Sequence, residues 1–159
     1  MLAVDANVLI RFLTRDDIGQ AARAARVLSR EEVWLAKTVL LETEWVLRSL
    51  YSQPAHIVAS ALRKLLGLPR VRVEDPRAVA KALDWVDSGL DFADALHLAS
   101  CGESTAFATF DERFAKRAPA SSQASPRSRS DILALLGSPH APHHRSPLFI
   151  PRFCPEQAW

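Results

Sequence analysis

Residues 2–13, LAVDANVLIRFL, place a short apolar run before an aspartate and a run with helical spacing after it. Leu2, Ala3 and Val4 have the character of a strand that ends at Asp5, and residues 7–13 have the apolar pattern of a short helix. A strand that ends at a carboxylate and turns at once into a helix is typical of α/β proteins. The fold prediction starts from this unit.

The same alternation continues along the chain. Further strands are predicted at 33–36, 71–73 and 105–109, and helices at 18–30, 38–51, 54–66, 76–87 and 91–101, with another starting at 112. Thr38 is the expected N-cap of its helix. This order predicts an α/β domain with a mostly parallel sheet of short strands flanked by helices. Ligands of such sheets bind beyond the carboxyl ends of the strands, where Asp5 and Asp111 lie.

Charge and composition divide the 159 residues into two parts. Residues 1–118 hold sixteen Lys and Arg against sixteen Asp and Glu, whereas the last 41 residues hold four Arg against two acids. Residues 119–130, PASSQASPRSRS, have the composition of a linker, 131–137 fit a short helix, and 138–159 are rich in Pro, His and Arg. We therefore expect one domain at 1–118 and an irregular, low-complexity tail at 119–159.

Several protein classes do not fit the sequence. No apolar run reaches the ~20 residues of a membrane span, and Met1 is followed too soon by Asp5 for a signal peptide. Cys101 and Cys154 form no CxxC pair, which favours a reducing cytoplasm over a disulfide framework. The expectation is a cytoplasmic protein with no membrane partner. Trp34, Trp45 and Trp85 are expected in its core.

Four carboxylates are candidates for chemistry. Asp94 lies in DFADALHLAS and has no Lys or Arg three or four positions away, although Asp91 before it can cap the helix. Glu42 has Thr38, Val39 and Trp45 at its helical neighbour positions and no cation among them, so we expect it to be held against apolar groups. Glu44 has Arg48 at i+4 as an ordinary surface pair. Each acid also has a plain structural explanation: Asp5 and Asp111 fit helix caps, Asp94 suits the positive end of a helix, and Glu42 suits partial exposure.

The four acids are more informative together than singly, because one α/β fold can bring strand ends and neighbouring helices to one edge of the sheet. Clustered carboxylates repel one another unless a cation lies between them. An all-oxygen ligand set suits Mg²⁺ or Mn²⁺, and such a site can hydrolyse a phosphodiester.

On the segments VDANVLIRFL, VLLETEWVLR, DFADALHLA and ATFDERFAK, the chain resembles PIN-domain ribonucleases. It is most similar to toxins of the virulence-associated protein C type, and the resemblance covers residues 2–117. It implies a PIN-like fold and a Mg²⁺- or Mn²⁺-dependent endoribonuclease. The acidic metal-binding and catalytic positions fall on Asp5, Glu42, Asp94 and Asp111, with Asn7 and Thr109 in support. It also implies a homodimer and a cognate antitoxin. The final strand of the family is not recognisable in the tail.

An RNA substrate would need cationic contacts. Arg11, Arg15, Arg23 and Arg26 could follow its backbone, although a solvated helix face is the simpler explanation of each residue taken singly. The alternative function is a non-catalytic PIN-fold module that binds antitoxin or RNA. A phosphotransferase with an Asp-x-Asp nucleophile pair fits less well, because Asp5 is followed by Ala6 and Asn7.

Overall fold

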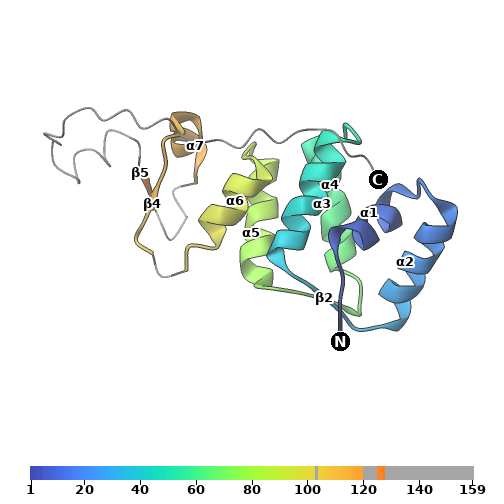
Figure 1. Ribbon diagram of the computed structural model, residues 1–159. Helices are drawn as coiled ribbons and strands as arrows, with labels where there is room; N and C mark the ends of the chain where they lie inside the picture. The colour runs from blue at the N-terminus through green and yellow to red at the C-terminus, as the bar shows by residue number, and fades with distance from the viewer. Residues whose placement is uncertain (103, 120–124, 128–159) are drawn as a thin grey trace, which may run out of the picture.

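The computed structural model describes residues 1–102, 104–119 and 125–127. In chain order the elements are β1 (Leu2–Ala3), α1 (Ala6–Thr14), α2 (Ile18–Arg30), β2 (Val33–Leu35), α3 (Lys37–Ser49), α4 (Ala55–Leu66), β3 (Val71–Val73), α5 (Pro76–Asp87), α6 (Phe92–Ala99), β4 (Ala106–Ala108), α7 (Glu112–Arg117) and β5 (Ser125–Arg127). Figure 1 shows α1 and α2 at one end of the molecule and β4, β5 and α7 at the other.

The larger sheet has three parallel strands in the order β1-β2-β3. Leu2 pairs with Val33, and Val33 pairs in turn with Val71. In β2 the side chains of Val33 and Leu35 are buried while Trp34 between them is exposed, which is the alternation expected of a strand. The prediction of a parallel sheet flanked by helices is confirmed.

Helices supply most of the core. Fully buried side chains from α1, α3, α4, α5 and α6 meet the sheet and one another, among them Leu9, Leu40, Leu62, Val79 and Phe92. Burying each such side chain contributes about 1.5–3 kcal/mol to folding. Trp85 joins this core as predicted, but Trp45 is 60% exposed and Trp34 is 36% exposed, so the prediction was wrong for these two.

Aspartates begin most of the helices. The side chains of Asp5, Asp17, Asp75, Asp91 and Asp111 each accept a hydrogen bond from a backbone N–H in the first turn of the following helix. Such a cap satisfies a donor that the helix itself leaves unpaired and contributes about 1 kcal/mol. Five of the chain's acids therefore have a structural role whether or not they have a chemical one.

Helix α3 begins differently from the prediction, which had Thr38 as its N-cap. The helix starts at Lys37 after Ala36, and no side chain of the cap residue bonds to its first turn. The Lys37 N–H donates instead to the Glu74 carboxylate at 2.9 Å, from the loop after β3. A long-range partner thus replaces the local cap.

The strands β4 and β5 form a separate two-stranded parallel sheet, with Ala106 opposite Ser125. Strand β5, Ser125–Arg127, lies within the segment 119–130, which has the composition of a linker. The helix predicted at 131–137 lies outside the described residues. Within the described ranges, every helix is too short or too polar to cross a membrane.

Candidate active site

Asp94 lies in the first turn of α6, one turn after the capping residue Asp91. Its side chain is half-buried and accepts no hydrogen bond from the residues that the structure describes, whereas Asp91 accepts one from the Ala93 N–H at 2.9 Å. Burial raises the pKa of Asp94, and the nearby carboxylates of Asp91 and Asp111 raise it further, while His97 acts in the opposite direction. Asp94 is therefore a carboxylate kept in a site that disfavours its charge.

Asp111 is the N-cap of α7 and accepts hydrogen bonds from the N–H groups of Arg113 and Phe114 at 2.8 and 3.0 Å. Its own N–H donates to the Thr109 hydroxyl at 3.0 Å. Phe114 anchors the helix, because its buried ring packs edge-to-face on Phe107 with centroids 5.4 Å apart. Thr109 thus supports the turn that carries Asp111.

A shallow depression of about 160 Å³ between α6 and α7 holds these acids. Its lining includes three acids, Asp91, Asp94 and Asp111. Arg113, Phe114 and Arg117 of α7 also line it. The Arg117 guanidinium reaches across to the Gly89 carbonyl oxygen at 3.5 Å. We name this the α6–α7 depression. Two of the four acids predicted from the sequence meet here, and Asp91, Arg113 and Arg117 are additions that the sequence analysis did not single out as site residues.

Asp5 lies in a different depression, of about 340 Å³, between α1 and α2. This depression is lined by Asp5, Asn7, Arg11, Gln20 and Arg23. The Asp5 carboxylate accepts a hydrogen bond from the Val8 N–H at 3.1 Å. Asn7 and Asp5 line the same depression, but no second acid lines it.

The two depressions are separate because of the strand pairing. Asp5 follows β1 of the larger sheet, whereas Asp111 follows β4, which pairs with β5 rather than with β1. Figure 1 shows the two strands well apart. Within the described ranges, no three His, Cys, Asp or Glu side chains lie close enough together to hold one metal ion. The carboxylate oxygens of the α6–α7 depression are the right kind of ligand for a hard divalent cation, but their spacing in this conformation is too wide for a complete site.

The two acids of α3 exchange the environments that the sequence predicted. Glu42 is exposed and not held against apolar groups, because the buried face of α3 runs through Leu40 and Thr43. Glu44 is only 7% exposed, with Arg48 at 3.4 Å. Burial raises the pKa of Glu44, the carboxylate of Asp91 raises it further, and Arg48 offsets part of the effect. The presence of a Lys or Arg one helical turn away predicts the Glu44–Arg48 ion pair, but it does not predict which face of α3 is buried.

The four arginines predicted to contact RNA lie in different surroundings. Arg11 is engaged, because its guanidinium pairs with Asp16 and also donates to Gln20 at 3.1 Å. Arg15 lines neither the Asp5 depression nor the α6–α7 depression. Arg23 lines the Asp5 depression, and Arg26 is exposed elsewhere on α2. Of the four, Arg23 is the one best placed beside a candidate acid.

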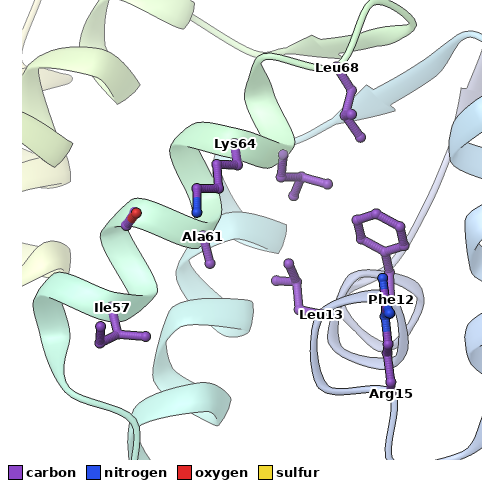
Figure 2. Close-up of a pocket in the computed structure, with 9 residues that line it drawn as sticks. Phe12, Leu13, Arg15, Ile57, Ala61, Lys64 and Leu68 are labelled. Carbon is purple, nitrogen blue, oxygen red and sulfur yellow. The ribbon is translucent and has the colours of Figure 1, made fainter.

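A hollow with a volume of about 460 Å³ lies between α1 and α4 (Figure 2). Its lining is Phe12, Leu13, Arg15, Ile57, Ser60, Ala61, Lys64, Leu65 and Leu68. No carboxylate lines it, so it lacks the ligands for metal chemistry. We name it the α1–α4 groove and treat it as a surface for binding rather than for catalysis.

Comparison with known proteins gives one family. The PIN domain model matches residues 2–119, which run from β1 to two residues beyond the end of α7 and include every predicted site residue. A comparison with curated proteins found no match.

Proposed function

The chain belongs to the PIN domain family, and from this premise we propose that it is a Mg²⁺- or Mn²⁺-dependent endoribonuclease that acts as the toxin of a toxin–antitoxin pair. PIN domains are generally nucleases, and therefore hydrolases, and generally use divalent metal ions. We propose that the catalytic domain ends near residue 118, close to the last residue of the family match, and that the protein acts in the cytoplasm, where cellular RNA is available.

The observation that carries the proposal is the environment of Asp94. The carboxylate is half-buried, accepts no hydrogen bond in the described part of the chain and shares a depression with two further carboxylates. Such crowding disfavours the folded state unless a cation or a substrate offsets it. Asp91 and Asp111 both serve as helix caps, whereas Asp94 makes no cap hydrogen bond, and only its place in the first turn of α6 favours an acid there.

Each proposed residue has a stated role. Asp94 and Asp111, with Asp5 and Glu42, would hold the metal ion, which when bound polarises the phosphodiester and lowers the pKa of its water. Asn7 and Thr109 would hold Asp5 and Asp111 in position. For Asp5 and Glu42 this role rests on their place in the sequence motif, because each lies outside the α6–α7 depression.

The experiment is cleavage of a mixed RNA pool by the purified chain, with Mg²⁺ and with a chelator, beside the Asp94→Asn variant. Cleavage should require Mg²⁺ and fall about 100-fold in the variant, a loss of about 2.7 kcal/mol of transition-state stabilisation. Mg²⁺ should also raise the melting temperature of the wild type more than that of Asp94→Asn, because the variant lacks one of the proposed ligands. Glu32→Gln, an exposed acid outside both depressions, is the control.

The alternative is a non-catalytic PIN-fold module that binds RNA or an antitoxin. The separation of Asp5 from Asp94 and Asp111 favours it, because a complete metal site is not assembled in the described part of the chain. A folded wild type that binds RNA but does not cleave it in Mg²⁺ would support this alternative and reject the nuclease.

For the partner, we propose an antitoxin that inserts an amphipathic helix into the α1–α4 groove. The floor of the groove is apolar, and Arg15 and Lys64 at its edge form no ion pair with any described residue. Apolar side chains flanked by acids would therefore match both its shape and its charge. We also propose a homodimer, following the family resemblance, and light scattering of the purified chain measures its mass.

A designed helical peptide with an apolar stripe between glutamates tests the groove. Lys64→Glu should weaken its binding about fivefold through like-charge repulsion, whereas Arg77→Glu, an exposed site on α5, should leave the affinity unchanged. Equal binding to all three proteins would reject the groove as the docking site.

A further inference from the structure

One face of α2 carries a row of arginines. Arg23, Arg26 and Arg30 are all exposed and follow one another at intervals of three and four residues, so they lie on one side of the helix. From Ile18 to Arg30 the helix contains no acid. We name these three residues the α2 arginine stripe. Figure 1 shows α2 at one end of the molecule, beside α1.

The helix itself does not account for the α2 arginine stripe. None of the three guanidinium groups forms an ion pair with a described residue. Like charges at these spacings repel and slightly destabilise a helix. Arg30 lies in the last turn, where the negative end of the helix dipole favours a cation. Arg23 and Arg26 lie before that turn, so their placement needs a reason outside the helix.

The α2 arginine stripe leads into the Asp5 depression. Arg23 lines this depression, where Asp5 is the one acid among the described lining residues. The other cation of the lining, Arg11, is already paired with Asp16. The positive charge that Arg23 offers beside Asp5 therefore does not depend on a bound metal ion.

The acids next to α2 in the chain lie at its two ends. Asp17 is the N-cap, and its carboxylate accepts hydrogen bonds from the backbone and side chain of Gln20. It lies about 9 Å along the helix axis from Arg23, whereas neighbouring arginines of the stripe are only about 4.5–6 Å apart along it. Glu31 follows the last residue of the helix. The positive potential is therefore strongest in the middle of α2.

This surface suits a phosphate backbone better than an acidic protein. A protein interface has an apolar centre, but the large exposed apolar side chain of α2, Ile18, lines a separate hollow with Phe12 and Arg15. No residue of the stripe lines that hollow. A row of cations without an apolar centre provides the contacts by which proteins hold a nucleic-acid backbone, independently of its sequence.

We infer that the α2 arginine stripe binds the backbone of the RNA strand and leads it into the Asp5 depression. The inference rests on the proposed function, in which RNA is the substrate, and it assigns the surface that holds the strand. It adds Arg30 to the contacts expected of Arg23 and Arg26, and it leaves out Arg11, which is engaged by Asp16.

RNA binding in a chelator tests the inference, because the stripe needs no metal ion. A fluorescent single-stranded RNA of about 20 nucleotides is titrated into the full wild-type chain at several salt concentrations. Arg26→Ala combined with Arg30→Ala should weaken binding about tenfold at the lowest salt. The slope of log affinity against log salt should fall by about 1.4, or about 0.7 for each phosphate contact on a single strand. Arg23→Ala should lower the slope by about 0.7.

Arg70→Ala combined with Arg77→Ala is the matched control. Both arginines are exposed, one just before β3 and the other on α5, and neither forms an ion pair with a described residue. The control loses the same charge, and its affinity should stay within about twofold of the wild type. Circular dichroism checks that every variant is folded. Equal effects of the two double variants would show that binding follows net charge alone and would overturn the inference.

Two further results would also overturn the inference. The first is a wild type that does not bind the RNA in chelator at the lowest salt. The second is a glutamate-rich peptide of about 20 residues that displaces the RNA with equal affinity, because the partner of the stripe would then be an acidic protein.

Cleavage in Mg²⁺, measured in parallel, tests the nuclease proposal separately. If the wild type cleaves RNA while Arg26→Ala with Arg30→Ala binds it as tightly as the wild type, the nuclease proposal stands and the role of the stripe falls. If the stripe variants lose RNA binding but the wild type does not cleave, the nuclease proposal falls and the stripe is still the surface that holds RNA.

Discussion

Asp5 and Asp111 are both helix N-caps, at opposite ends of the molecule, yet their surroundings differ. Each follows a strand, caps the next helix and lines a depression that also holds an arginine. Around Asp5 the other lining residues are neutral or basic, whereas Asp111 shares its depression with Asp91 and Asp94. The capping geometry is thus common to both regions, but the accumulation of negative charge is not.

The difference shows which acid carries information about function. A cap hydrogen bond explains the presence of Asp5 and of Asp111 without any chemistry, and Asp17 and Asp75 play the same part elsewhere. Asp94 has no such bond in the described part of the chain and lies where its charge is disfavoured. The surroundings of Asp5 and of Asp111 can therefore serve one reaction only if Asp5 has a role beyond capping α1.

The largest expected effect comes from Asp5→Asn. Asparagine caps a helix as well as aspartate does, so the free energy of unfolding should change by less than about 0.5 kcal/mol. If Asp5 serves the same reaction as Asp94, cleavage should nevertheless fall about 100-fold, because the negative charge needed for a metal ion is lost. Initial cleavage rates and thermal unfolding, measured on the same preparation, separate the two roles.

Asp17→Asn is the matched control for this test. Asp17 caps α2 through the Gln20 N–H at 2.8 Å and lies outside both depressions. This substitution should leave the cleavage rate unchanged. If Asp5→Asn cleaves RNA at the wild-type rate, Asp5 is only a helix cap like Asp17. The α6–α7 depression would then act without the Asp5 region.

Much of the fold was predictable because its signals are local. The bounds of α2 and α5 agree with the prediction, since the apolar spacing and an aspartate before the first turn are local to both helices, and Ser88 and Gly89 follow α5. The start of α3 was not predictable in this way, because its first N–H is satisfied by Glu74 from 37 residues away.

The candidate site depended on information that local patterns lack. The sequence indicated that Asp5 and Asp111 follow strands, but not that β4 pairs with β5 in a sheet of its own. It paired Glu44 with Arg48 correctly, yet burial depends on which helix packs over α3, so the exposed and buried acids were interchanged. Arg113 was overlooked because an arginine at a helix start is unremarkable until three aspartates are found beside it.

The smallest expected effect concerns the charge of Asp94 without any metal. Its pKa is raised above the ordinary 3.8, mainly by burial and then by Asp91 and Asp111, so the ionised carboxylate disfavours the folded state. The stability that the protonated Asp94 contributes is therefore full below pH 3.8 and is lost as the pH rises through the raised pKa.

In chelator at pH 7, Asp94→Asn should stabilise the fold by about 0.5 kcal/mol, a value kept small by the partial exposure of the group. The gain should shrink as the pH falls through the raised pKa, because the wild-type carboxyl then takes up a proton. Urea unfolding at pH 7 and pH 4, with Glu32→Gln as the control, measures this difference. A variant less stable than the wild type at pH 7 would mean that the charge of Asp94 supports the helix, and the contrast with the capping aspartates would disappear.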